Sequence, residues 1–370
     1  YMNSITTEKD LFFMKRALSL AAKAKGATSP NPMVGAVIVK DGRIIAEDYH
    51  KKAGEPHAEA LAISKAGKRA KGSTLYVTLE PCCHSDKRTP PCTKAIINSG
   101  IKRVFISMKD PNPKVFGKGI EELKNHGIEV YSGILEEKAK KLNEAYIKFI
   151  TTKTPFVILK TAMTLDGKIA TPEGQSKWIT GERARKIVHE MRGSVDAILT
   201  AIGTVKADNP ELTARIKGVK KQPIRIVIDP DLEIPIDYKI LNTPPETIIV
   251  TRKHNIETKN QKKDILVTKG VKMIEYDGDR VDLRWLMKIL GENSIISVMI
   301  EGGSSLNAYA LQDKIVDKIV FFIAPKIIGG KNSISAVGGD IFCRLENAYR
   351  VKDIKIKRLG DDLMIEGYIV

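Results

Sequence analysis

The sequence predicts two consecutive α/β domains, the first of them a layered sandwich with a mostly parallel central sheet. Strand-sized apolar runs alternate with segments of helical period, and this pattern starts again after residue 150. The length of 370 residues is enough for about two to three domains. The polar segment Thr151–Pro155 interrupts both patterns, so we place the boundary there, between residues 1–150 and residues 155–370.

Helices and strands are expected to alternate through the first domain. Apolar residues at a helical period predict a helix over 8–25, which the loop 26–32 ends. Lys40–Arg43 has the composition of a hairpin turn, and Pro56 suits the first turn of a helix, where its missing N–H costs nothing. The remaining expected elements are helices over 57–66, 93–99 and 119–126, and strands over 34–39, 44–46, 75–79, 104–107 and 129–131.

The second domain continues the alternation, without internal repeats or low-complexity segments. Its expected elements are strands over 156–160, 197–200, 224–228, 247–250, 295–300 and 316–324, and helices near 182–192, 281–290 and 304–311.

The chain is basic, with 61 Lys and Arg residues against 44 Asp and Glu and a formal net charge of +17. This balance permits binding to nucleic acid or to anionic small molecules. The positive residues are spread through both halves, which does not indicate a nucleic-acid-binding arm. No apolar run approaches the ~20 residues of a membrane span, and Tyr1–Asp10 lacks the apolar core of a signal peptide. We therefore expect a cytoplasmic protein with no membrane partner.

Three of the four cysteines, Cys82, Cys83 and Cys92, lie within eleven positions. In a reducing compartment such a cluster indicates metal binding or catalysis rather than a disulfide framework. His57 with the thiolates of Cys82 and Cys92 would supply three corners of a tetrahedral zinc site, and a water molecule activated by the metal can take the fourth. Glu59, two positions from His57, could take the proton of that water and return it to a leaving amine.

This arrangement follows the H-x-E…P-C-x-x-C pattern of zinc nucleobase deaminases, with one departure. Nine residues rather than two separate Cys82 from Cys92, and the longer segment contains Cys83 and His84. A purely structural zinc site is the alternative, because Cys83 and His84 could complete a closed set of four protein ligands. The residues alone leave both interpretations open.

Motifs in both halves resemble those of one family. They are Asn31–Ala36, His57–Glu59, Leu79–Cys82, Thr89–Cys92, Asp110–Pro113, Lys160–Ala170, Ser176–Thr180, Gly203–Pro210, Leu212–Arg215 and Glu301–Gly303. In this order they are similar to the motifs of the bifunctional deaminase/reductase family of bacterial riboflavin biosynthesis. Beyond about residue 305 no matching motif is evident.

The resemblance implies a fold and a deaminase site. The fold would be an N-terminal cytidine-deaminase-like α/β/α sandwich followed by a dihydrofolate-reductase-like α/β domain. One Zn²⁺ per chain would be bound by His57, Cys82 and Cys92, with Glu59 as the catalytic proton shuttle. The loop after Cys82 is one residue longer than usual in the family, so Cys83 stays an alternative ligand, although Cys82 matches because it follows Pro81. The implied substrate-binding residues are Asn31, His84, Arg88, Asp110 and Asn112, of which His84 and Arg88 would meet the phosphate.

Residues 155–370 contain neither G-x-G-x-x-G nor a P-loop, but Ile300–Leu306 places two glycines between an apolar strand and a helix. A phosphate can approach the backbone closely at such a turn. By the resemblance, this half binds NADPH. The implied cofactor-binding residues are Ala162, Trp178, Thr204, Asp208, Gly303, Ser304, Ser305 and Leu306. The implied substrate-binding residues are Lys160, Ser176, Leu212, Arg215 and Glu301. From the residues alone, Trp178 could equally be a core aromatic, and Lys160 and Asp208 could belong to ordinary ion pairs.

We therefore predict a bifunctional enzyme of riboflavin biosynthesis. Its N-terminal domain would hydrolytically deaminate 2,5-diamino-6-(5-phosphoribosylamino)pyrimidin-4-one, and its C-terminal domain would use NADPH to reduce the ribosyl chain to ribityl. The expected partner is this phosphorylated small molecule rather than nucleic acid, and a homo-oligomer is expected. A tRNA deaminase with an accessory domain is the main alternative. A ligand-binding regulator built on an inactive deaminase domain is another, although Glu59 beside three metal ligands favours an enzyme.

Overall fold

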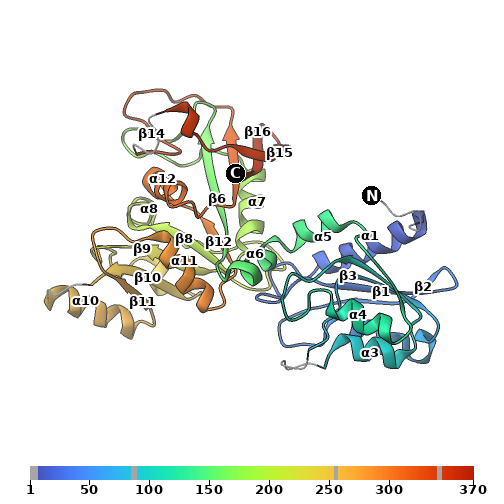
Figure 1. Cartoon of the computed structure of the whole chain (residues 1–370). Helices are drawn as coiled ribbons and strands as arrows, with labels where there is room; N and C mark the ends of the chain where they lie inside the picture. The colour runs from blue at the N-terminus through green and yellow to red at the C-terminus, as the bar shows by residue number, and fades with distance from the viewer. Residues whose placement is uncertain (1–6, 85–89, 254–256, 340–343) are drawn as a thin grey trace. The chain divides into compact units, whose positions relative to one another are not determined.

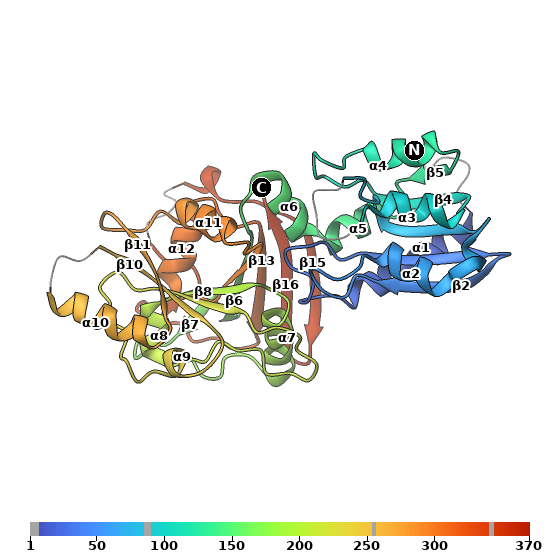
Figure 2. The same cartoon turned by 90° about the horizontal axis from the view of Figure 1, so that it is seen from below.

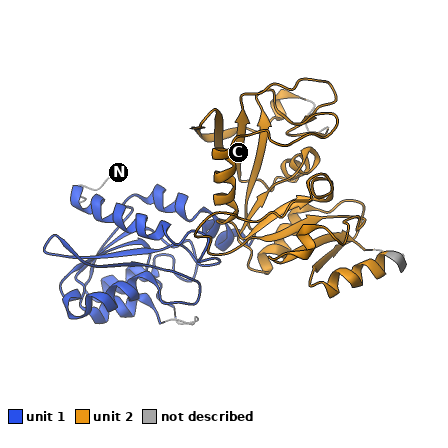
Figure 3. Cartoon of the chain, turned by 180° about the vertical axis from the view of Figure 1, so that it is seen from behind, with its two compact units in different colours: residues 1–153 blue, residues 154–370 orange. Residues whose placement is uncertain are grey.

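The computed structural model describes residues 7–84, 90–253, 257–339 and 344–370, and the chain divides into two compact units (Figure 3). Unit 1 comprises residues 1–153 and unit 2 comprises residues 154–370. The division falls within the polar segment Thr151–Pro155. No helix in the described ranges combines the length and the apolar character needed to cross a membrane.

Unit 1 is built on a five-stranded sheet with the strand order β2-β1-β3-β4-β5. Its strands are β1 (Gly35–Lys40), β2 (Arg43–Tyr49), β3 (Thr74–Leu79), β4 (Arg103–Met108) and β5 (Glu129–Ser132). The strands β3, β4 and β5 are parallel, but β1 is antiparallel to both of its neighbours, so the prediction of a mostly parallel sheet is only half right. The tight turn at Asp41 and Gly42, both at positive φ, reverses the chain between β1 and β2.

Helices cover both faces of this sheet, as Figures 1 and 2 show. The helices of unit 1 are α1 (Glu8–Ala22), α2 (Ala58–Ala66), α3 (Cys92–Ser99), α4 (Lys118–Asn125), α5 (Glu136–Leu142) and α6 (Glu144–Thr152), with a 3-10 turn, η1, over Gly67–Ala70. On one face, α1 packs Phe13 and Met14 into a core with Tyr76 and Phe105. On the other face, α2 and α3 pack alanine and isoleucine side chains against β1, β3 and β4. The predicted α/β/α sandwich is confirmed.

Unit 2 is built on a nine-stranded sheet with the order β11-β10-β9-β8-β12-β6-β13-β16-β15. Its strands are β6 (Phe156–Thr164), β8 (Ala197–Ala201), β9 (Ile224–Ile228), β10 (Thr247–Arg252), β11 (Lys272–Tyr276), β12 (Ser297–Ile300), β13 (Lys318–Ala324), β15 (Val351–Leu359) and β16 (Asp362–Ile369). The strands from β11 to β13 pair in parallel, and β16 and β15 complete the sheet antiparallel. A separate two-stranded ladder joins β7 (Lys168–Ala170) to β14 (Ile334–Ser335).

The helices of unit 2 include several that the sequence pattern did not predict. They are α7 (Glu182–Arg192), α8 (Ile202–Asp208), α9 (Lys239–Asn242), α10 (Glu257–Thr268), α11 (Leu283–Glu292) and α12 (Ser304–Gln312), with a 3-10 turn, η2, over Leu345–Asn347. The elements missed by the prediction are α5, α6, β7, α8, α9, α10, β11, β14, β15 and β16. The strand β15 shows the reason. It is an edge strand whose residues are almost all exposed, so no buried face imposes an apolar period on its sequence.

Candidate active sites

Three side chains of the types that bind metals converge near the carboxyl end of β3. His57 directly precedes α2, Cys82 follows β3 after Pro81, and Cys92 is the first residue of α3. The Nδ1 atom of His57 lies 3.5 Å from Cys82 Sγ and 3.3 Å from Cys92 Sγ. The helices α2 and α3 therefore both begin at the cluster.

The donor set of this cluster fits zinc. One ligand atom from each of His57, Cys82 and Cys92 lies within 4.8 Å of the others. Imidazole nitrogen and thiolate sulfur are the ligands that zinc prefers, and three protein ligands leave one position open. Cys83 faces away from the cluster, with its Sγ 3.9 Å from the carbonyl oxygen of Lys114. Among the described residues the cluster includes neither Cys83 nor His84, so the closed structural site is not assembled.

Glu59, in the first turn of α2, lies buried beside the metal cluster. Its side chain is 3 % exposed, and its Oε2 atom has no hydrogen-bond partner among the described residues. Burial raises the pKa of the Glu59 carboxyl. A buried carboxylate oxygen without a donor is costly unless a ligand or water completes it. Glu59 therefore has the position and the free acceptor that proton transfer at the cluster requires.

A second set of polar groups follows β4. The Asp110 side chain is buried, which raises its pKa to about 6, and its Oδ1 accepts hydrogen bonds from Asn112 N at 2.9 Å and from Tyr146 Oη at 2.9 Å. Asn112 in turn accepts a bond on its Oδ1 from Lys114 N at 3.1 Å. These bonds hold Asp110 and Asn112 in one fixed turn at the edge of the sheet where the metal ligands gather.

Glu80 also holds this turn in place. The buried Glu80 carboxylate accepts hydrogen bonds from the backbone N–H groups of Asp110, Gly117 and Ile120, at 3.2, 3.1 and 3.2 Å. The helix α4 comes so close that a Cβ atom on Gly119 would lie 2.1 Å from the carbonyl oxygen of Pro81. The strand end that carries Cys82 is thus tied to the turn that carries Asp110.

The other residues predicted to bind the deaminase substrate are Asn31, His84 and Arg88. The Nδ2 atom of Asn31 lies 3.3 Å from Nε2 of His50, whose ring packs edge-on against His57 with 5.2 Å between ring centroids. The Nδ1 atom of His84 is buried without a partner among the described residues. Arg88 lies outside the described residues.

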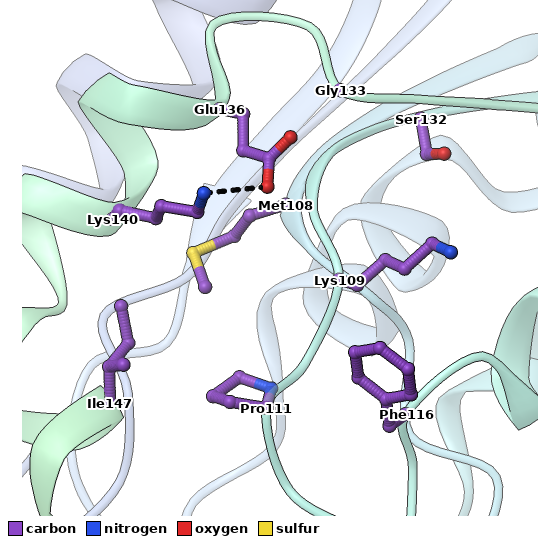
Figure 4. Close-up of a pocket in the computed structure, with 9 residues that line it drawn as sticks. All are labelled: Met108, Lys109, Pro111, Phe116, Ser132, Gly133, Glu136, Lys140 and Ile147. Atoms are coloured by element: carbon purple, nitrogen blue, oxygen red, sulfur yellow. Dashed lines mark ion pairs between the residues drawn. The ribbon is translucent and has the colours of Figure 1, made fainter.

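A cavity of about 490 Å³ opens beside this region (Figure 4). It is lined by Met108, Lys109, Pro111, Phe116, Ser132, Gly133, Glu136, Lys140 and Ile147. In Figure 4 the ammonium group of Lys140 pairs with Glu136, at 3.0 Å. No metal-cluster residue lines the cavity, but Lys109 and Pro111 flank Asp110 and Ile147 follows Tyr146, so the cavity wall contains the backbone that carries both polar groups.

In unit 2, Glu301 is the centre of a buried ion network at the carboxyl end of β12. Its Oε1 lies 2.6 Å from Arg192 Nε, and its Oε2 lies 3.0 Å from Arg192 Nη2 and 2.9 Å from Lys160 Nζ. Burial alone would raise the pKa of Glu301, but the charges of Arg192 and Lys160 outweigh it and hold the pKa well below its usual range. Glu301 is therefore ionised, and both its oxygens are already engaged. Lys160 thus forms an ion pair, as the alternative interpretation of this residue expected.

The two glycines after Glu301 lead into α12. Gly303 is extended, at φ −83° and ψ −177°, and a Cβ atom placed on it would meet only Thr204 Oγ1, at 3.5 Å. There is thus room for a side chain at this position, bordered by Thr204. Ser304 and Ser305 follow at the start of α12, while Leu306 is buried in the main core of the unit.

The other residues predicted for the reductase lie on loops of unit 2, except Ala162 in β6 and Asp208, the last residue of α8. Trp178 is 67 % exposed, with the Arg185 guanidinium 4.6 Å from its ring centroid, so it is not a core aromatic. Ser176 donates to Asp208 Oδ1 at 3.4 Å, and Lys177 approaches the same oxygen at 3.7 Å. Leu212 is buried, whereas Arg215 is exposed and bonds to Glu211 at 2.9 Å.

Sequence reasoning missed four residues that shape these sites: Glu80, Asn143, Tyr146 and Arg192. Glu80 lies inside the motif Leu79–Cys82, and its position directly before Pro81 and Cys82 could have indicated a role at the site. Asn143 and Tyr146 lie in a stretch for which no element was predicted, and Arg192 ends a predicted helix. Tyr146 contacts Asp110, Arg192 contacts Glu301 and Asn143 contacts Met33, at separations of 36, 109 and 110 residues that no local pattern reveals.

Family models match both units. Residues 7–108 match the cytidine and deoxycytidylate deaminase zinc-binding region, and residues 155–365 match the RibD C-terminal domain. Fold and sites together define a bifunctional enzyme in which a zinc-binding deaminase is joined to a reductase. The chain is 49 % identical over 360 residues to the riboflavin biosynthesis protein RibD of Aquifex aeolicus, covering 97 % of this chain and 98 % of the relative. It belongs to the RibD family, the bifunctional deaminase/reductases of riboflavin biosynthesis.

Other RibD proteins are also similar to this chain over nearly its whole length. The RibD protein of Escherichia coli is 39 % identical, with 96 % of this chain and 98 % of the relative covered. The structure of Acinetobacter baumannii RibD, form 1, superposes with a TM-score of 0.89 at 36 % identity, covering 98 % of this chain and 99 % of that one. A Thermotoga maritima structure, described as a diaminohydroxyphosphoribosylaminopyrimidine deaminase/5-amino-6-(5-phosphoribosylamino)uracil reductase, gives 0.85 at 39 % identity, covering 97 % and 98 %. The second half is a reductase domain, so the chain is not a tRNA deaminase with an accessory domain.

Proposed function

We propose that residues 1–150 deaminate 2,5-diamino-6-(5-phosphoribosylamino)pyrimidin-4-one and that residues 155–370 then reduce the ribosyl chain of the product with NADPH. The description of the Thermotoga maritima relative as a deaminase and reductase of these compounds supports this choice of substrates. The observation that carries the proposal is the convergence of His57, Cys82 and Cys92 beside the buried, unpartnered oxygen of Glu59. A structural zinc site needs no such carboxylate, whereas hydrolytic deamination does. The direct test is ammonia release from this diaminopyrimidine nucleotide, followed by NADPH oxidation.

In the proposed deaminase site each residue has one role. His57, Cys82 and Cys92 would hold a single zinc ion, which supplies Lewis-acid activation of a water molecule when it is bound. Glu59 would accept a proton from that water and donate one to the departing amine. Asp110, Asn112 and Asn31 would hold the pyrimidine and its ribose, and His84 and Arg88 would meet the phosphate. The net charge of +17 favours a phosphorylated substrate.

The two adjacent cysteines can be separated by experiment. Cys82→Ser is expected to lose zinc, because the Cys82 thiolate faces His57, whereas Cys83→Ser is expected to keep about one zinc per chain, because Cys83 faces Lys114. The measurement is the zinc content of the purified proteins by elemental analysis. Each variant serves as the other's matched control, and the reverse pattern of zinc loss would transfer the ligand role to Cys83.

In the proposed reductase site, the turn before α12 binds NADPH and the Glu301 network faces the substrate. NADPH, when bound, supplies the hydride. The open space at Gly303 and the free N–H groups at the start of α12 suit a phosphate of the cofactor, with Thr204 at the border. Ala162, Trp178, Asp208, Ser304, Ser305 and Leu306 complete the proposed cofactor site. Glu301 would hold Lys160 in place for the substrate, and Ser176, Leu212 and Arg215 would contribute the remaining contacts.

Gly303→Val tests this cofactor site. Valine tolerates the extended backbone at this position, and its Cβ meets only an ordinary contact, so we expect a folded protein. The branched side chain would occupy the space proposed for the phosphate, and NADPH binding should weaken at least about tenfold, or about 1.4 kcal/mol. Fluorescence titration with NADPH measures the change, and unaltered ammonia release shows that the rest of the chain is intact. Normal NADPH affinity would move the cofactor away from this turn.

A homo-oligomeric state and a cytoplasmic location stay predictions from the sequence. Size measurement in solution would test the first, and fractionation of the producing cells would test the second.

A further inference from the structure

We propose that Asn143 and Tyr146 are positioning residues of the deaminase, which fix its substrate-binding groups without touching the metal cluster. Asn143 lies at the junction of α5 and α6, and Tyr146 lies one turn further on, within α6. The inference rests on the roles proposed above for Asp110 and Asn31. It adds the helix pair α5–α6, which follows the last strand of the sheet, to the machinery that recognises the pyrimidine substrate.

Tyr146 acts on Asp110. The Tyr146 hydroxyl is buried and donates to Asp110 Oδ1 at 2.9 Å, and the backbone N–H of Asn112 donates to the same oxygen. No described residue bonds to Oδ2 of Asp110. Two donors on one oxygen fix the rotation of a carboxylate, so the other oxygen keeps one direction. The arrangement leaves Oδ2 as the free acceptor for amino or hydroxyl groups of the substrate.

Asn143 acts on the loop that carries Asn31. Its buried side chain accepts a hydrogen bond from Met33 N on Oδ1 at 2.8 Å and donates from Nδ2 to Met33 O at 3.0 Å. This pair of bonds satisfies both backbone groups of Met33, two positions after Asn31. The contact spans 110 residues of chain, so it holds the loop to α5–α6 and not to its own neighbours.

The hydrogen bonds of Asn143 and Tyr146 go to Met33 and Asp110 rather than to the metal-cluster residues. The match to the deaminase zinc-binding region ends at residue 108, before Asp110, Asn143 and Tyr146. His57 precedes α2, Cys82 follows β3 and Cys92 starts α3, and among the bonds of the described residues none joins Asn143 or Tyr146 to them. Removing the Tyr146 hydroxyl should therefore affect substrate binding and leave zinc in place.

The decisive variant is Tyr146→Phe in the full chain, because it deletes one hydroxyl and keeps the ring. We expect KM for the diaminopyrimidine nucleotide to rise about tenfold, the usual effect of losing a hydrogen bond to a charged group. The kcat for ammonia release should stay within about twofold, and zinc content and NADPH-dependent reduction should be unchanged. Tyr131→Phe is the matched control, because the one hydrogen bond of the Tyr131 hydroxyl within the described part of the chain is an exposed contact to Glu129 at 3.4 Å. It should alter neither constant.

A double-mutant cycle with Asp110→Asn shows whether Tyr146 acts through Asp110. If it does, Tyr146→Phe raises KM in the natural chain but has little further effect when Asp110 is already Asn. Independent, multiplicative effects on KM would overturn the inference, as would an unchanged KM in Tyr146→Phe. An unchanged KM in Asp110→Asn alone would instead refute the proposed role of Asp110. Because this result comes from a different variant, the two failures can be told apart.

Asn143→Asp provides the second arm. It keeps the acceptor for Met33 N but replaces the donor to Met33 O with a second acceptor, so the loop that carries Asn31 should loosen. We expect a rise in KM of at least about tenfold with zinc retained. Asn125→Asp, on the exposed surface of α4, makes the same chemical change without such contacts and should leave KM unchanged. Zinc loss, or a fall in kcat with KM unchanged, would contradict a positioning role for Asn143.

Discussion

Glu59→Gln is expected to reduce ammonia release by about 10²–10⁴-fold while zinc stays bound, the usual contribution of general acid–base catalysis. Glutamine has nearly the same shape as glutamate and fits the same buried position in the first turn of α2. An amide cannot accept the proton of a water molecule, so the loss falls on chemistry rather than on folding. The measurement is kcat for ammonia release together with zinc content.

Glu55→Gln is the control for this prediction. Glu55 lies four positions earlier, on the exposed loop before α2, and the substitution removes the same charge near the site. Its ammonia release should match that of the natural chain. If Glu59→Gln also retained most of the natural rate, Glu59 would have no part in proton transfer, and the unpartnered oxygen would need another explanation.

Glu301→Gln is expected to lower the stability of unit 2 by about 3–5 kcal/mol, the usual cost of removing one member of a buried ion pair. The change leaves Arg192 and Lys160, each with only 13 % of its side chain exposed, without their common anion. For a unit of this size the midpoint of thermal unfolding should fall by roughly 6–20 °C. Calorimetry of the full chain would follow the transition of unit 2, and reductase activity should fall with it.

Glu233→Gln makes the same substitution in an exposed ion pair of unit 2, between Glu233 and Lys206 at 3.0 Å. It should change stability by no more than about 0.5 kcal/mol, because exposed pairs contribute little. Ammonia release should be unaffected by either variant. A Glu301→Gln protein as stable as the Glu233→Gln protein would show that the network around Glu301 is hydrated rather than buried.

The residues of the zinc cluster were predictable because their chemistry lies in short motifs. His57 and Glu59 are two positions apart, a spacing that does not share a helix face. The structure resolves this difficulty, since His57 lies just outside α2 in an extended conformation while Glu59 is inside its first turn. Both side chains can then reach the same point. The motif thus predicted which residue types meet, and the start of the helix explains how they meet.

The Glu301 network could not be predicted in the same way. Lys160 comes from β6, Arg192 from the end of α7 and Glu301 from the end of β12, with sequence separations of 109 and 141 residues. Only the pairing of β12 with β6 and β8 brings these segments together. A family resemblance could assign Lys160 and Glu301 to the substrate, but it could not show that they bind each other through a buried contact that also includes Arg192.

The sequence by itself determined the class of protein, because zinc chemistry needs a specific set of donor atoms and the motifs contain that set in order. The tertiary structure decided which of the two adjacent cysteines joins the cluster with His57 and Cys92. Neighbouring side chains beyond a strand end point in different directions, so Cys82 faces His57 while Cys83 faces Lys114, although the two are chemically identical. It also decided that Tyr146 reaches Asp110 and Asn143 reaches Met33. Hydrogen bonds act over about 3 Å, and only the packing of α5 and α6 brings residues so distant in the chain to that separation.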